Sequence, residues 1–229
     1  MVKEIEQSAE DDQNESILDK KYRFPLKLAF LVAFFNQLSG INAFLYYAPR
    51  ILEKAGFASQ QSLLSSISIG LMNLIFTFVG LWLIDRIGRK TLLIIGSFGY
   101  IVSLSMVALS FYISASQLFL LTFLLLFIAS HAIGQGAVIW VLISEIFPNN
   151  VRSKGQALGS ATHWIFAALI TLVAPIFIND KNDGIFNSNP WPIFAFFAVM
   201  MVLQLVWILT KVPETKGVSL EELQKKLVQ

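Results

Sequence analysis

Cysteine is absent from this sequence, and charged residues are scarce. Without cysteine the chain has no disulfide, no thiolate metal site and no cysteine nucleophile. Only 14% of the 229 residues are charged, 55% are hydrophobic, and the mean hydropathy is +0.66. Soluble domains carry about 25% charged residues, so this balance predicts an integral membrane protein.

A concentrated basic patch is also lacking. The net charge is only +2, and the lysine and arginine residues are distributed among short connecting segments. Nucleic acid is therefore not expected as a partner. The beginning of the chain is rich in acids and contains no apolar core, which excludes a signal peptide. We interpret residues 1–22 as a cytoplasmic N-terminal segment.

Long apolar runs dominate the rest of the chain. Six runs approach or exceed the roughly 20 residues that a membrane-spanning helix needs. They lie at positions 24–49, 62–84, 91–112, 118–142, 156–178 and 191–210. The predicted fold class is therefore an all-α integral membrane protein, with a six-transmembrane-helix bundle over residues 23–210 and a cytoplasmic tail over residues 211–229.

The distribution of positive charge predicts how the bundle is oriented. If the N-terminus is cytoplasmic, all but three of the 17 lysine and arginine residues lie in cytoplasmic segments, and the exceptions are Arg50, Lys54 and Lys181. Positive residues accumulate on the cytoplasmic side of membrane proteins. We therefore expect a multi-pass protein of the cell membrane, surrounded by lipid, with both termini in the cytoplasm.

The first apolar run contains polar side chains near its middle. Gln37 and Asn42 flank a Ser39-Gly40 pair, and an unsatisfied amide in hydrocarbon costs about 4–8 kcal/mol. On a regular helix these two amides point about 140° apart, so a break at Ser39-Gly40 would help them converge on one ligand. The alternative is that they hydrogen-bond neighbouring helices and tie the spans together. The residues by themselves leave both interpretations open.

Two charged segments lie at predicted cytoplasmic ends of spans. One is the turn Asp85–Lys90, and the other is Ser144–Arg152, in which Pro148 predicts a helix end. Glu145 and Arg152 then fall on the same membrane face as the turn, where opposite charges can pair as a breakable latch. The turn is also interpretable as a topology anchor that does no more than stop translocation.

Candidate catalytic and metal-binding groups are sparse. His163 has no second histidine nearby except His131 on another span. We interpret His163 as a packed, hydrogen-bonding residue and predict neither a metal site nor a cofactor. The sequence offers no paired intramembrane acids and no pattern of a nucleophile with its base, so we do not expect an enzyme.

Four segments, in their order and spacing, resemble the C-terminal half of the sugar porters of the major facilitator superfamily. They are Gln37–Tyr47, Asp85–Lys90, Ser144–Arg152 and Pro213–Gly217. The resemblance extends from about Tyr22 to Gly217 and covers about half of the family's helices. It implies half of a major facilitator superfamily fold and transport of a sugar across the membrane by alternating access.

The resemblance also implies which residues bind the sugar. Gln37 and Asn42 match amides that hydrogen-bond sugar hydroxyls, and Asn73 matches an amide of the second span. Trp140 matches an aromatic residue that stacks against the sugar ring. Asn36 and His163 stand where relatives commonly have amides, and we include both in the substrate-binding set. The remaining matches are the extracellular gate, Tyr46 and Tyr47, and the cytoplasmic latch, Asp85, Arg86, Arg89, Glu145 and Arg152.

Several positions depart from the family pattern. Asn36 is shorter than the Gln that many relatives have, and Ala132 lies where some animal facilitators have an acid. Gln135 and Ile139 stand where several relatives have Pro. A hexose, a pentose and a polyol therefore all remain open as substrates, as do uniport and proton symport.

The resemblance covers one bundle only. Alternating access needs two bundles that rock around a site at the membrane midplane. We therefore expect a partner, either a separate N-terminal half or a second copy of the chain. The alternative is a truncated or split-gene remnant that inserts into the membrane without transporting alone.

Overall fold

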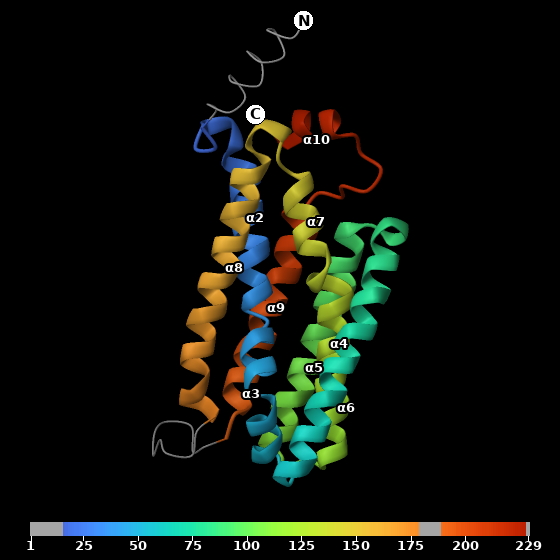
Figure 1. Cartoon of the computed structure of the whole chain (residues 1–229), viewed down its shortest axis with the longest axis vertical. Helices are drawn as coiled ribbons and strands as arrows, with labels where there is room; N and C mark the ends of the chain where they lie inside the picture. Colours follow the sequence, from blue (N-terminus) through green and yellow to red (C-terminus); the bar gives the residue numbers. More distant parts are fainter. Residues whose placement is uncertain (1–15, 179–188, 228–229) are drawn as a thin grey trace, which may run out of the picture.

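The computed structural model describes residues 16–178 and 189–227, and the predicted segments 1–22 and 211–229 therefore lie only partly within it. The described residues form helices joined by turns, arranged as an elongated bundle (Figure 1). The helices are η1 Lys20–Tyr22, α2 Arg23–Gln37, α3 Ile41–Lys54, α4 Ser59–Ile87, α5 Arg89–Tyr112, α6 Gln117–His131, η2 Ala132–Gly136, α7 Val138–Glu145, α8 Asn149–Ile178, α9 Trp191–Lys211 and α10 Leu220–Leu227.

Six membrane-spanning helices are present in the described residues, and the predicted fold class is confirmed. The first span, Lys20–Lys54, combines η1, α2 and α3, and the fourth, Gln117–Glu145, combines α6, η2 and α7. The other spans are α4, α5, α8 and α9. Each predicted apolar run lies inside one of these spans. The helices continue beyond the runs because their polar ends reach the headgroup region, where water is available.

The first span is interrupted between α2 and α3, as the Ser39-Gly40 pair predicted. Gly40 adopts a φ of 79°, a left-handed conformation that residues with a Cβ rarely take. The hydroxyl of Ser39 donates a hydrogen bond to the carbonyl of Asn36 over 2.6 Å, near the end of α2, and reinforces the turn there. The ring of Phe197 in α9 occupies the position that a Cβ at residue 40 would take. The break is therefore specified both by backbone conformation and by packing.

The fourth span contains a π-helical turn, η2, and such turns are frequent at functional sites. Glycines allow η2 to lie directly against α5. A Cβ on Gly134 would come within 2.6 Å of the Cα of Gly96, so neither residue has room for a side chain. Next to the turn, His131 is hydrogen-bonded to the hydroxyl of Tyr100 in α5 over 2.5 Å.

Two apolar clusters fill the bundle along its length, one around Phe44 and Phe127 and the other around Tyr22 and Phe147. α5 packs along α6 and α9, and α2 packs along α8 (Figure 1). In contrast, α4 and α8 bury only 17% and 22% of their most apolar segments. Their outward faces carry large apolar side chains, which require lipid or another protein to cover them.

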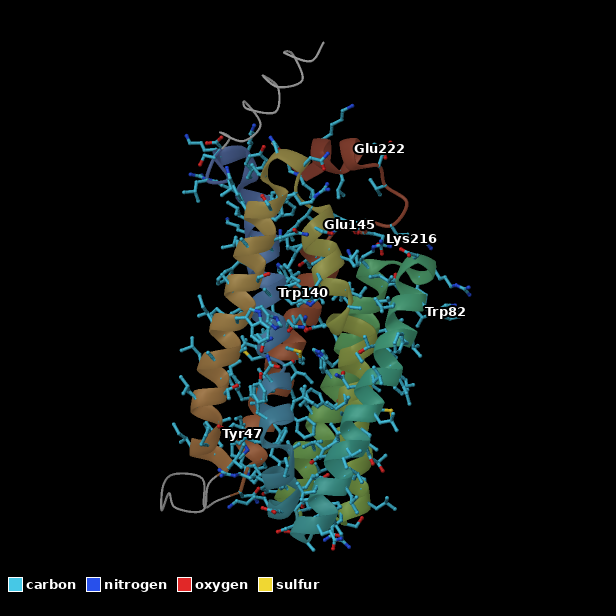
Figure 2. The ribbon with its side chains drawn as sticks, viewed as in Figure 1. Tyr47, Trp82, Trp140, Glu145, Lys216 and Glu222 are labelled. Atoms are coloured by element: carbon cyan, nitrogen blue, oxygen red, sulfur yellow. The ribbon has the colours of Figure 1, made fainter. Side chains whose placement is uncertain are left out.

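The two ends of the bundle differ in character. Figure 2 shows Glu145 toward one end, Tyr47 toward the other, and Trp140 between them. α10 lies at the Glu145 end, where the hydroxyl of Ser219 accepts a hydrogen bond from the backbone N–H of Glu222 and caps the helix. Leu223 of α10 is buried in the same apolar cluster as Tyr22. The tail helix is therefore docked on the bundle rather than detached from it.

Candidate functional site

Three amides converge at the break between α2 and α3. Asn42 in the first turn of α3 donates from Nδ2 to Oε1 of Gln37 over 2.9 Å. Gln37 in turn donates from Nε2 to Oδ1 of Asn36 over 3.0 Å. On an unbroken helix Gln37 and Asn42 would diverge, so the interruption confirms the predicted convergence of the two amides. Their hydrogen bonds also offset the cost of placing amides at this depth.

A histidine and a tryptophan complete the cluster from two other helices. His163 of α8 lies within 3.0 Å of Nε2 of Gln37, measured to its Nδ1. The ring of Trp140 in α7 lies 5.0 Å from the ring of His163, at an interplanar angle of 55°. Trp140 is 39% exposed, whereas Asn36 and Gln37 are buried. The amides therefore form the buried part of the cluster, and Trp140 forms an aromatic side that is open to the surface.

Gln135 is a member of the cluster that the sequence analysis noted only as a departure from the family pattern. Its Oε1 accepts a hydrogen bond from Nδ2 of Asn36 over 3.2 Å. The contact joins the break in the first span to the π turn in the fourth. The sequence signal for this role was a polar residue between Gly134 and Gly136, where the chain can approach a neighbouring helix closely.

Asn73 and the two tyrosines lie outside this hydrogen-bonded cluster. Asn73 is half-buried on α4, and within the described residues no hydrogen bond joins its side chain to the amides. The hydroxyl of Tyr47 donates to the carbonyl of Thr171 over 3.3 Å and ties α3 to α8. Tyr46, on the same helix, is 61% exposed. The structure thus brings together four of the six predicted substrate-binding residues, Asn36, Gln37, Asn42 and His163, and places Trp140 against His163.

The chemistry of the cluster suits a polyhydroxylated ligand. Amides donate and accept hydrogen bonds at the same site, as hydroxyl groups also do. An indole ring offers a flat apolar surface beside them. Among the described residues, no three histidine, aspartate or glutamate side chains gather in the way a metal ion requires.

A charged cluster lies at the Glu145 end. Arg89 at the start of α5 donates to both carboxylate oxygens of Glu145, over 3.2 Å from Nε and 2.8 Å from NH2. The guanidinium also lies 2.9 Å from Oδ1 of Asp85. A two-pronged arginine–carboxylate contact is stronger and more directional than a single ion pair. Arg89 therefore links α4, α5 and α7.

Glu214 and Thr215 belong to this charged cluster, although the sequence analysis did not count them as site residues. Glu214 accepts hydrogen bonds from the backbone N–H groups of Arg89 and Lys90, over 2.9 and 3.1 Å, and so caps the start of α5. Thr215 donates to Oε2 of Glu145 over 2.6 Å. The sequence signal for these two residues was the Pro213–Gly217 segment, which resembles a sugar-porter motif but to which the sequence analysis assigned no function.

The other two predicted latch residues make different contacts. Arg86 lies over the ring of Trp82, with its guanidinium carbon 3.8 Å from the ring centre. Arg152 donates from Nε to the carbonyl of Phe147 over 3.3 Å, beside the turn between α7 and α8. Within the residues that the structure describes, Asp85, Arg89 and Glu145 are brought together, and no hydrogen bond or ion pair joins Arg86 or Arg152 to them.

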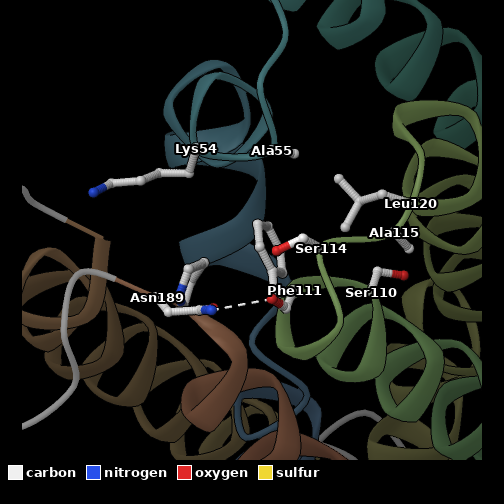
Figure 3. A pocket seen from close by; sticks show the side chains of 9 residues that line it. Lys54, Ala55, Ser110, Phe111, Ser114, Ala115, Leu120 and Asn189 are labelled. Atoms are coloured by element: carbon white, nitrogen blue, oxygen red, sulfur yellow. Dashed lines mark hydrogen bonds between the residues drawn. The ribbon is translucent and has the colours of Figure 1, made fainter.

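A separate pocket of about 340 Å³ opens at the Tyr47 end, between the ends of α3 and α5 and the start of α9 (Figure 3). Its lining includes Lys54, Ser110 and Asn189. Nδ2 of Asn189 donates to the carbonyl of Phe111 over 3.0 Å, which closes one side of the pocket. No residue of the amide cluster lines this pocket, so it is distinct from the candidate site.

Comparisons with known proteins give consistent matches. A family model described as "Sugar (and other) transporter" matches residues 1–227. The chain is 35% identical over 202 residues to the D-xylose-proton symporter of Escherichia coli strain K12. The alignment covers 86% of this chain and 40% of the symporter. The chain is 32% identical to the arabinose-proton symporter of Bacillus subtilis strain 168, over 98% of this chain and 48% of that protein.

A solved structure supports the same match. The crystal structure of a double-tryptophan mutant of XylE superposes with a TM-score of 0.85 at 31% identity, covering 99% of this chain and 48% of that one. The chain therefore spans about half the length of the proteins that it matches.

Proposed function

The chain belongs to the family of sugar (and other) transporters, with a major facilitator superfamily fold, and from this premise we propose that it is the C-terminal six-helix half of a sugar carrier. The proposed substrate is a hexose, a pentose or a polyol. The proposed mechanism is alternating access around a site near the middle of the membrane.

The amide cluster at the α2–α3 break is the observation that carries this proposal. Interrupted helices commonly form the substrate site of secondary transporters at the membrane midplane. Here Asn42, Gln37 and Asn36 form a hydrogen-bonded series, with Trp140 beside it at mid-height in the bundle (Figure 2). We propose that Asn36, Gln37, Asn42, Asn73 and His163 contact sugar hydroxyls, that Trp140 covers the ring, and that Tyr46 and Tyr47 close the extracellular side.

The outward faces of α4 and α8 support a partner for this half. Both helices expose large apolar side chains, and the amides together with Trp140 form only one wall of a site. We propose that a separate N-terminal half, or a second copy of the chain, supplies the opposite wall. A remnant that inserts without transporting remains the competing proposal, and the uptake experiment in the Discussion separates the two.

Removal of either central amide is expected to weaken sugar binding. Gln37→Ala and Asn42→Ala each leave a sugar hydroxyl without its partner, at a cost of about 1–3 kcal/mol, or roughly 5- to 150-fold in affinity. Equilibrium binding of radiolabelled D-xylose, D-glucose and D-galactose to the complex that contains this chain measures the effect. Gln61→Ala removes an exposed amide of α4 and serves as the matched control. Unchanged affinity in both variants would contradict a role in sugar binding and would indicate that these residues only hydrogen-bond neighbouring helices.

We propose that the cluster of Arg89, Glu145 and Asp85 is a cytoplasmic latch that stabilises the outward-facing state. Glu145→Gln weakens the two-pronged contact with Arg89 and is expected to shift the conformational ratio toward the inward-facing form by about 5- to 30-fold, for a loss of roughly 1–2 kcal/mol. Because Glu145 contacts Arg89 and Thr215 and, among the described residues, makes no hydrogen bond to the amide cluster, transport rate should change more than sugar selectivity.

The natural absence of cysteine makes this shift measurable. A single cysteine introduced at the half-buried Leu45, next to the proposed gate, reports accessibility at the Tyr47 end by its rate of labelling. Arg86→Gln is the matched control. It removes a charge at the Glu145 end, but the Arg86 side chain lies over Trp82 rather than against Glu145. Equal labelling rates in the two variants and the parent would contradict the latch and leave the segment as a topology anchor.

A further inference from the structure

The four amides of the candidate site form a series with one direction. Asn42 donates to Gln37, Gln37 donates to Asn36, and Asn36 donates to Gln135. The two middle amides, Gln37 and Asn36, therefore each accept through the oxygen and donate through the nitrogen, whereas Asn42 begins the series as a donor and Gln135 ends it as an acceptor. Hydrogen bonds arranged in this way polarise one another, so the orientation of one member depends on the others.

Gln135 stands at the buried end of this series. Its exposed fraction is 0%, and its Nε2 has no hydrogen-bond partner within the described residues. A buried unpaired N–H group costs about 1–3 kcal/mol. A leucine or methionine would fill the same space without that cost. Gln135 therefore lowers the stability of the fold relative to an apolar residue of similar size, which points to a role other than packing.

The position of Gln135 is held by the backbone around it. It lies in the η2 turn, between Gly134, which packs against Gly96 of α5, and Gly136. This close backbone contact leaves the turn little freedom to move away from α5. The acceptor that Gln135 offers to Asn36 is therefore anchored to α5 as well as to the fourth span.

We propose that Gln135 is a positioning residue that determines sugar selectivity through Asn36. Its Oε1 holds Nδ2 of Asn36, so Oδ1 of Asn36 faces Gln37, and Oε1 of Gln37 consequently faces Asn42. The series thereby sets which donors and acceptors Gln37 and Asn42 present to the hydroxyls of a sugar. Gln135 itself does not touch the ligand. The inference rests on the proposed function, because it assumes that the ligand of this cluster is a sugar.

The test replaces Gln135 by a residue of similar size that cannot accept a hydrogen bond. Gln135→Met is expected to weaken binding of the preferred sugar by about 5- to 20-fold, because Asn36 and Gln37 lose their fixed orientation. The affinity ratio between D-glucose and D-galactose, which differ in one hydroxyl orientation, should fall toward one. Gln135→Glu keeps an acceptor at the same place and should restore both the affinity and the ratio to within about twofold.

Two controls separate positioning from stability. Gln204→Met removes another buried glutamine with an unpaired atom, on α9 and outside the amide series. It should leave the affinity and the sugar ratio unchanged. In an Asn36→Ala background, Gln135→Met should add less than about a twofold further loss, because the residue through which Gln135 acts is already gone.

The outcomes are distinguishable from a failure of the proposed function. If the parent complex binds sugar but Gln135→Met leaves affinity and ratio unchanged, or adds its full effect to Asn36→Ala, the positioning role is overturned and the sugar site stands. If the parent complex binds none of D-xylose, D-glucose, D-galactose and the polyol D-sorbitol, the proposed function is overturned and this inference with it.

Discussion

Sealed vesicles that contain the purified chain alone are expected to show no saturable, stereoselective sugar uptake. Insertion requires only apolar spans and a positive-charge asymmetry, and the chain has both. Transport requires more. In the proposed site the amides and Trp140 form one wall, and the described residues contain no second bundle that could close the path alternately on the two sides of the membrane.

The expected result changes when a partner is supplied. Uptake of radiolabelled sugar should appear when the chain is reconstituted with an N-terminal half, if that is the partner. Uptake that appears only at a high protein-to-lipid ratio would identify a second copy as the partner. Stereoselective uptake by the chain at monomeric dilution would contradict the proposal that it is half of a carrier. Failure of every combination would favour the non-transporting remnant.

A single methyl group at Gly134 is expected to destabilise the bundle. Gly134→Ala places a Cβ within 2.6 Å of the Cα of Gly96 and 3.2 Å of the carbonyl oxygen of Leu92, and these backbone atoms cannot rotate away. Overpacking of this kind costs about 1–3 kcal/mol. For a chain of this length the cost corresponds to a decrease in Tm of about 2–12 °C.

Thermal unfolding of the detergent-solubilised protein measures this effect, and Gly70→Ala is the matched control. Gly70 is also a helix glycine, in α4, but a Cβ there meets no atom within 4 Å. Alanine is favoured over glycine inside a helix by about 0.8–1.0 kcal/mol, so Gly70→Ala should leave Tm unchanged or raise it slightly. Equal Tm values for the two variants would show that α5 and η2 can separate without cost.

Much of the architecture could be predicted from the sequence because membrane insertion depends on local properties. Length and hydropathy were enough to locate all six spans, since each apolar run must satisfy its own backbone hydrogen bonds inside the bilayer. The break in the first span was likewise predictable from Ser39-Gly40, because glycine tolerates the left-handed conformation found at Gly40. The resemblance to sugar porters added the candidate site residues, and their roles in sugar binding stay predictions.

Only the tertiary structure decided which polar groups meet. The contact between Asn36 and Gln135 joins residues 99 positions apart, and that between Thr215 and Glu145 joins residues 70 apart. Neither was apparent in the sequence, because a membrane helix is apolar both toward lipid and toward its neighbours, and its pattern does not indicate which face packs inward. The rotation of each helix is set instead by close packing, as at Gly134 and Gly96. The sequence by itself therefore determined the six membrane-spanning helices of the described residues and the place where the first span breaks, whereas packing between helices determined how that break is joined to the π turn.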